Sequence, residues 1–219
     1  MSIITTVYVP EGIVMAADSR LTGTTTYPDG TKDRHTLSDN SQKLFLIKNN
    51  SIGIACCGDA EINGKSVGDF IREFEIGLVK ESDSVEDIAN KLKEYTMQTH
   101  GRGVLYHVSG FMNDVQHVYC ILDGDISRQN LTGNSVDYGV CWNGEQEALL
   151  RLLAAQPSVP VDFKFMQLKD GIDFAEFLVD TTIKYLRFRT GIATCGGAID
   201  ILLITKDEAR WIKHKILNP

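Results

Sequence analysis

The sequence TTVYVPEGIVMAADSR, residues 5–20, decides how this chain begins to fold. Two runs rich in Ile, Val and Thr, residues 3–9 and 12–18, lie on either side of the turn sequence PEG, residues 10–12. β-Branched residues favour strands, and Pro and Gly favour the tight turn between them. The stretch therefore predicts a β-hairpin close to the first residue.

A second hairpin is predicted by SQKLFLIKNNSIGIACCGDAE, residues 41–61. Its strands are expected at Lys43–Ile47 and Ile52–Cys56, on either side of the polar turn KNNS. Residues 21–42, between the two hairpins, are polar and rich in turn-forming residues, which predicts a long surface loop.

The rest of the chain divides into blocks of helices and blocks of strands. Apolar residues at helical spacing predict helices, Ser84 with Asp87 resembles a capping box, and short apolar runs predict strands. In chain order the expected elements are helices over 67–78 and 85–95, a meander of strands at 104–112, 115–122, 126–131 and 135–141, helices over 148–153 (ending before Pro157) and 174–185, and strands at 198–204 and 209–216.

This block order predicts an α+β fold. Segregated strands and helices favour antiparallel sheets over a doubly wound parallel sheet. Two packed sheets with a helix pair on each outer face, a four-layer αββα sandwich, would bury every apolar stripe. The length suits one large domain, and residues 1–219 are expected to form it.

Charge and hydropathy exclude several classes of function. The net charge of −7 and the pI near 5.2 argue against a nucleic-acid-binding surface, which needs a basic patch. A secretory signal would require basic residues near its start, but no Lys or Arg precedes Arg20. No segment approaches the roughly 20 apolar residues of a membrane span. We expect a cytoplasmic protein without a membrane partner.

Cysteine and histidine spacing predicts neither a metal site nor a cofactor. The five cysteines form no CxxC pair and are expected to be reduced, mostly buried thiols. The five histidines include no HExxH pair, although His107 and His117 are expected on neighbouring strands. The sequence GDAEINGKS departs from the phosphate-loop pattern at Asp59, whose charge would repel phosphate.

The two hairpin sequences resemble the opening of proteasome β subunits and their bacterial relatives, which are N-terminal-nucleophile hydrolases. In that family the Asp of the AADSR-type motif follows the catalytic N-terminal residue by sixteen positions. Counted back from Asp18, that residue is Ser2, which removal of Met1 would expose. In the second hairpin, the resemblance places Lys43 as the catalytic lysine and Gly58 as the oxyanion-hole glycine.

These residues suit acyl transfer. The Ser2 hydroxyl needs a base to accept its proton, and an α-amine with a pKa near 7.7–8.0 is tethered in the same residue. The Lys43 ammonium would lower the pKa of that amine, and Asp18 would hold the lysine in place. The Gly58 N–H would stabilise the tetrahedral oxyanion by about 3–4 kcal/mol.

The chain departs from the family pattern at several places. A Ser nucleophile lacks the Thr methyl that restricts χ1. The sequence WNGE, with Asn143, stands where the family has a Gly-Ser-Gly-like turn, and IATCGG, residues 192–197, replaces Asp-x-x-Ser-Gly-Gly. Ile192 and Cys195 thus occupy the positions of the supporting Asp and Ser. We assign supporting roles to Arg20, Asn143 and Cys195.

The resemblance implies a peptidase subunit that hydrolyses peptide bonds through Ser2. It also implies a homo-oligomeric ring, peptide or unfolded-protein substrates and an ATP-dependent unfoldase as partner, with residues 21–42 shaping the pocket. Two alternatives remain open: a non-catalytic structural or assembly subunit, and a small-molecule amidase with the same chemistry. A further alternative is that Asp18 and Lys43 are ordinary residues at strand ends without a catalytic role.

Overall fold

Two five-stranded antiparallel sheets form the centre of the protein in a computed structural model, which describes residues 2–156 and 160–216. In spatial order, the first sheet consists of β14 (Gly139–Gly144), β1 (Ile3–Val9), β2 (Gly12–Ala17), β15 (Asp200–Ile204) and β16 (Ala209–Lys213). The second consists of β11 (Asp125–Arg128), β10 (Val115–Leu122), β9 (Val104–Met112), β6 (Ile52–Gly58) and β5 (Leu44–Ile47).

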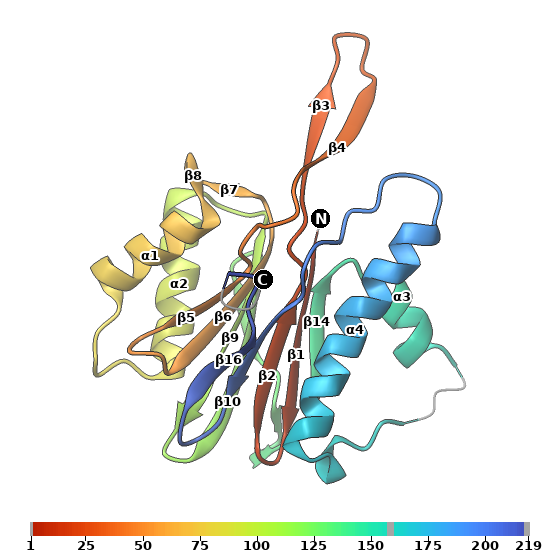
Figure 1. Cartoon of the computed structure of the whole chain (residues 1–219). Coiled ribbons are helices and arrows are strands. Elements are labelled where there is room, and N and C mark those ends of the chain that lie inside the picture. Colours follow the sequence, from red (N-terminus) through yellow and green to blue (C-terminus); the bar gives the residue numbers. More distant parts are fainter. Residues whose placement is uncertain (1, 157–159, 217–219) are drawn as a thin grey trace.

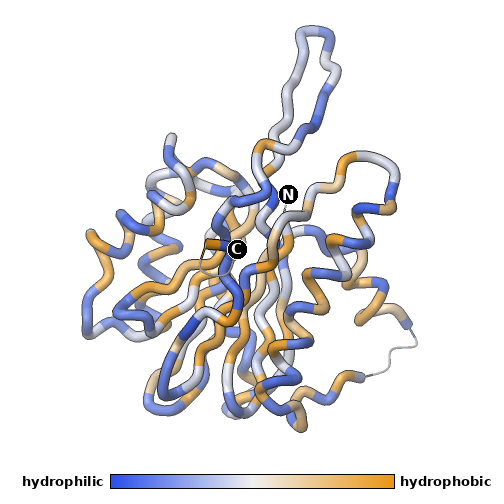
Figure 2. The backbone as a smooth tube through the Cα atoms, in the orientation of Figure 1, coloured by the Kyte–Doolittle hydropathy of each residue, from blue (hydrophilic) through white to orange (hydrophobic). Residues whose placement is uncertain are grey.

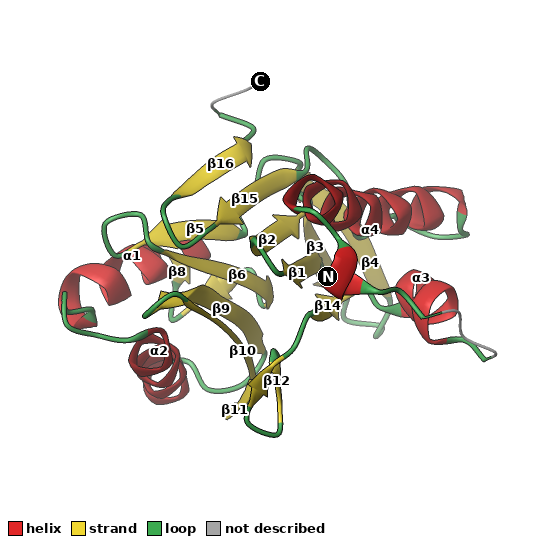
Figure 3. Cartoon of the chain, turned by 90° about the horizontal axis from the view of Figure 1, so that it is seen from below, coloured by secondary structure: helices red, strands yellow, loops and turns green. Residues whose placement is uncertain are grey.

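Helices lie on both sides of the sheet pair (Figures 1 and 3). The helices α1 (Val67–Leu78) and α2 (Val85–Thr99) pack on the second sheet, and α4 (Leu168–Phe188) packs on β1 and β2. The short α3 (Glu147–Leu149) continues as a π-helical turn, Leu150–Ala154, and a 3₁₀ turn, Phe163–Phe165, precedes α4. The predicted helix end at Pro157 lies outside the described residues.

The apolar core has three parts, and each lies between two layers. Phe70 and Phe74 of α1 pack with the second sheet, and Leu178 and Val179 of α4 pack with the first. Met15 belongs to a third cluster that joins the facing sides of the two sheets. Figure 2 shows the corresponding apolar segments along the central strands. From these contacts we propose that the whole fold has the layer order helices, sheet, sheet, helices.

The predicted surface loop at residues 21–42 is instead mostly a hairpin, which corrects the sequence analysis. Its strands β3 (Leu21–Thr26) and β4 (Lys32–Ser38) pair with each other and project from the body of the molecule (Figure 1). The threonine run has strand propensity but offers no apolar face, so the usual alternating pattern is absent.

The predicted meander is also corrected at its last strand. β14 does not belong to the second sheet with β9 and β10. It pairs antiparallel with β1 in the first sheet, with Ile3 opposite Gly144. This register brings the WNGE sequence to the start of β1, where Ser2 lies. Short ribbons complete the strands: β7 (Glu61–Ile62) with β8 (Lys65–Ser66), and β12 (Leu131–Thr132) with β13 (Ser135–Val136).

Within residues 2–156 and 160–216, no helix is both long enough and apolar enough to cross a bilayer.

Candidate active site

Ser2 lies immediately before β1 and is 7% exposed. Its carbonyl oxygen accepts a hydrogen bond from the Glu145 backbone N–H at 2.8 Å, and the next carbonyl, of Ile3, accepts one from Asp18 N–H at 3.3 Å. Both neighbouring strands, β14 and β2, thus hold the start of the chain. Met1 lies outside the described residues.

Asp18 follows β2 and is fully surrounded by hydrogen-bond donors. Its Oδ1 accepts from the Ile3 N–H at 3.0 Å and from Lys43 Nζ at 2.6 Å. Its Oδ2 accepts from the Gly196 N–H at 3.0 Å and from the Arg20 N–H at 3.1 Å. With only 1% of Asp18 exposed, this carboxylate joins three separate segments of the chain around one buried charge.

Lys43 lies directly before β5 and points its ammonium group toward the start of the chain. Besides its ion pair with Asp18, Nζ donates to the Arg20 carbonyl oxygen at 2.7 Å. Because Asp18 Oδ1 is also bonded to Ile3 N, the ammonium lies within two hydrogen-bond lengths of the residue after Ser2. The buried positive charge is therefore linked through Asp18 to the backbone N–H of the residue that follows Ser2.

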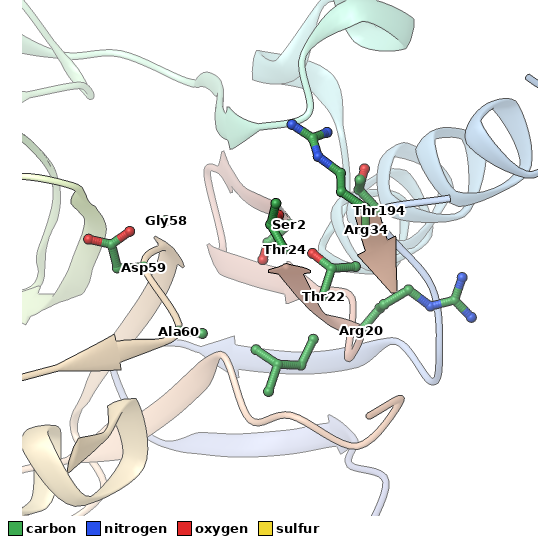
Figure 4. A pocket seen from close by; sticks show the side chains of 10 residues that line it. Ser2, Arg20, Thr22, Thr24, Arg34, Gly58, Asp59, Ala60 and Thr194 are labelled. Carbon is green, nitrogen blue, oxygen red and sulfur yellow. The ribbon is translucent and has the colours of Figure 1, made fainter. Parts of the chain in front are cut away.

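Ser2 and Gly58 line the same pocket, whose volume is about 360 Å³. Gly58 ends β6 with φ of +113°, and a Cβ there would lie 2.1 Å from the carbonyl oxygen of Gly103. Figure 4 shows Ser2 between the segment from Gly58 to Ala60 on one side and Thr194 on the other. The projecting hairpin and its approach contribute Arg20, Leu21, Thr22, Thr24 and Arg34.

Arg20 links two loops at the edge of this pocket. Its Nε and Nη2 donate to the two carboxylate oxygens of Asp39 at 2.6 and 2.9 Å, and its Nη1 donates to the Ala193 carbonyl oxygen at 3.1 Å. The hydrogen bond from this guanidinium lowers the pKa of Asp39. Arg20 therefore holds the loop whose Gly196 N–H reaches Asp18.

The other two predicted supporting residues have different surroundings. Cys195 is buried next to Gly196, and burial, followed by the charge of Asp18, raises the pKa of its thiol. Asn143 is directed away from the nucleophile: its Oδ1 lies 2.8 Å from His107 Nε2. The structure thus brings together Ser2, Asp18, Lys43, Gly58 and Arg20, with Cys195 behind them, and places Asn143 elsewhere.

Glu145 and Thr194 contribute to the site but were not singled out in the sequence. The Thr194 hydroxyl donates to Glu145 Oε1 at 2.6 Å, and the Glu145 N–H holds the Ser2 carbonyl. Each residue belongs to a stretch that departs from the family pattern, WNGE and IATCGG. Those departures were the available signal, because they mark the two loops that contact the start of the chain.

Comparison with known proteins finds likeness only at the level of the fold. No protein-family model matches the sequence, and no curated protein matches it. A solved structure of an Anbu mutant from Hyphomicrobium sp. strain MC1 superposes with a TM-score of 0.66 at 14% sequence identity, over 98% of this chain and 86% of that chain.

These comparisons correct the family inferred from the hairpin motifs. Assignment to the proteasome β-subunit family is wrong at that level of detail, because neither a family model nor a curated sequence supports it. What the comparisons support is a fold shared with the Anbu structure.

Proposed function

We propose that this protein hydrolyses peptide bonds with Ser2 as an N-terminal nucleophile, after removal of Met1. The observation that carries the proposal is the shared acceptor Asp18 Oδ1, which bonds both the Ile3 N–H and the Lys43 ammonium. An ordinary pair of residues at strand ends would be solvated. Here both side chains are at most 6% exposed, and Asp18 bonds the N–H of the residue that follows Ser2.

The proposed reaction begins when Ser2 Oγ attacks the carbonyl carbon of the substrate. The free α-amine of Ser2 accepts the hydroxyl proton and then passes it to the leaving amine as the C–N bond breaks. Water hydrolyses the resulting ester, with the α-amine again acting as base. Lys43 would favour the neutral amine and stabilise developing negative charge, and the Gly58 N–H is the proposed oxyanion donor.

The pocket supports a peptide substrate. Its volume of about 360 Å³ suits one side chain beside the scissile bond, and its lining of Thr24, Arg34 and Asp59 would favour polar groups there. Assembly into a homo-oligomeric ring served by an ATP-dependent unfoldase stays a prediction, to be tested by light scattering of the purified protein.

A non-catalytic subunit is the second candidate. It is favoured by Ile192, which is 38% exposed, and by Cys195, whose raised thiol pKa keeps it neutral. Neither can replace an Asp or a Ser that orients an N-terminal amine. Against this candidate, Thr194 and Glu145 supply a hydrogen-bonded link to Ser2 from the same two loops.

Intact-mass spectrometry followed by active-site labelling tests the proposal. We expect a mass that lacks Met1 and one covalent adduct of a peptide epoxyketone, which reacts with an N-terminal hydroxyl and its amine. The adduct should be absent in Ser2→Ala and present in Ser51→Ala, because Ser51 lies in a turn at the opposite end of β6 from Gly58. A protein that retains Met1, or labelling unchanged in Ser2→Ala, would favour the non-catalytic subunit.

A substrate panel separates the remaining alternative. Cleavage of fluorogenic peptides but not of short acylated amines supports a peptidase, and the reverse result supports a small-molecule amidase.

A further inference from the structure

A second group of reactive side chains lies between the two sheets and shares no residue with the pocket at Ser2. His107 is on β9, Cys120 is on β10 and Cys141 is on β14. Cys120 is directly opposite His107 in the second sheet, and Cys141 comes from the edge strand of the first. One nitrogen of the histidine and the two sulfurs all lie within 4.8 Å of one another.

The histidine ring is oriented so that an unprotonated nitrogen faces the sulfurs. Its Nε2 lies 2.8 Å from Asn143 Oδ1, and because an amide oxygen only accepts, Nε2 carries the proton. Nδ1 is therefore the acceptor, and it receives the Thr6 hydroxyl at 2.8 Å. Cys141 Sγ lies 3.8 Å from the same Nδ1.

The group borders a pocket. His107 is fully buried and Cys141 is 9% exposed, whereas Cys120 is half-buried. Cys120, Cys141 and Asn143 line a pocket of about 380 Å³, which opens beside the sulfurs. Three donors thus converge from the protein, and a fourth position faces the pocket.

We propose that His107 Nδ1, Cys120 Sγ and Cys141 Sγ bind a zinc ion, with a water or a small ligand from the pocket in the fourth position. Zinc prefers a tetrahedral set of nitrogen and sulfur ligands, at about 2.0–2.1 Å and 2.3 Å respectively. Such ligands lie roughly 3.5–3.8 Å apart, so the Cys141–His107 separation of 3.8 Å needs little adjustment. Thiolates disfavour Mg²⁺ and Ca²⁺, which select oxygen ligands.

Asn143 and Thr6 complete the proposed site from outside the ligand set. A zinc-bound histidine typically donates its other N–H to an oxygen acceptor, which fixes the ring and its tautomer. Asn143 Oδ1 already has that position. On metal binding the Thr6 hydroxyl would release Nδ1 and turn to another acceptor, so no backbone movement is required.

The metal content of the reduced protein tests this proposal. After incubation with Zn²⁺ and gel filtration, we expect about one zinc per chain, which is the expectation for a single site. Co²⁺ should give a thiolate charge-transfer band in the near ultraviolet, and Zn²⁺ should raise the Tm of the wild type.

Variants locate the site. Cys120→Ser and Cys141→Ser should lose the Co²⁺ band, and Asn143→Ala should bind zinc roughly 10- to 100-fold more weakly. Cys56→Ala is the matched control, because Cys56 is a buried cysteine of the same sheet that packs toward α1 and α2. It should bind zinc like the wild type.

Several results would overturn the proposal. Reduced wild-type protein that takes up no zinc, or uptake that is equal in Cys120→Ser and wild type, refutes it without depending on the stability of any variant. A protein isolated with a Cys120–Cys141 disulfide, and without metal affinity after reduction, would show that the cysteines form a redox pair instead.

Discussion

Asp18→Asn tests the buried ion pair on which the proposed active site depends. The substitution keeps the shape of the side chain but removes its charge and one of its two acceptor oxygens. Three backbone N–H groups and Lys43 would then compete for one oxygen, or face an amide NH₂ group. Each buried donor left without a partner costs about 1–3 kcal/mol, and a broken buried ion pair costs about 3–5 kcal/mol.

The expected loss in the free energy of unfolding is therefore about 3–5 kcal/mol. For a chain of this length, that corresponds to a Tm decrease of roughly 6–20 °C. Asp180→Asn is the matched control: Asp180 and Lys184 form an ion pair of the same length, 2.6 Å, but their side chains are 38% and 65% exposed. Exposed helical pairs contribute only about 0.3–0.5 kcal/mol.

Urea denaturation followed by circular dichroism measures both variants. The double variant Asp18→Asn/Lys43→Met separates charge from packing, because it removes both charges together. It should be more stable than the sum of the two single losses implies, since no buried charge is left without a partner. If Asp18→Asn loses less than about 1 kcal/mol, as an exposed pair would, the buried pair described here does not exist in solution.

Two further predictions concern the backbone at Gly58 and the thiols. Gly58→Ala should destabilise the protein by roughly 1–3 kcal/mol more than Gly64→Ala, as measured by urea denaturation. Both glycines have positive φ, but of the two only Gly58 would bring an added Cβ against a backbone carbonyl oxygen. Equal losses in the two variants would contradict this explanation. In metal-free protein, a hydrogen bond with Cys141 lowers the pKa of Cys120 below that of a free thiol, so Cys120 should react readily with iodoacetamide near neutral pH. Burial raises the pKa of Cys57 to about 12, so Cys57 should stay unmodified there; mass mapping that shows Cys57 reacting first would refute both assignments.

The sequence predicted the elements that local pattern determines. The first hairpin, expected at residues 3–9 and 12–18, is β1 and β2 within one residue, since each strand is a run of β-branched residues with a turn between them. The first two helices also match, because their apolar stripes and serine caps are local signals. Asp18 and Lys43 were predicted as a pair from the family resemblance of the two hairpin sequences, and Lys43 Nζ lies 2.6 Å from Asp18 Oδ1.

Features set by long-range pairing could not be predicted in the same way. The residues of β14 do not indicate that this strand pairs with β1 in the first sheet, since an apolar run suits either sheet. This pairing also explains why the sequence analysis expected no metal site. Cys141 lies close to His107 and Cys120 because β14 belongs to the first sheet, which packs on the second. Spacing rules detect ligands that share one local segment, and these three come from three strands.

Ile192 and Cys195 differ from the Asp and Ser that the resemblance of the hairpin sequences implies at these positions. The backbone of their loop still reaches the carboxylate, because the Gly196 N–H bonds Asp18 Oδ2 whatever side chain precedes it. The polar link that an Asp and a Ser would provide is replaced by the Thr194 hydroxyl on Glu145, whose own N–H holds the Ser2 carbonyl. Support for the proposed nucleophile would therefore depend on backbone groups and on a neighbouring side chain. Comparing a motif position by position does not detect such support.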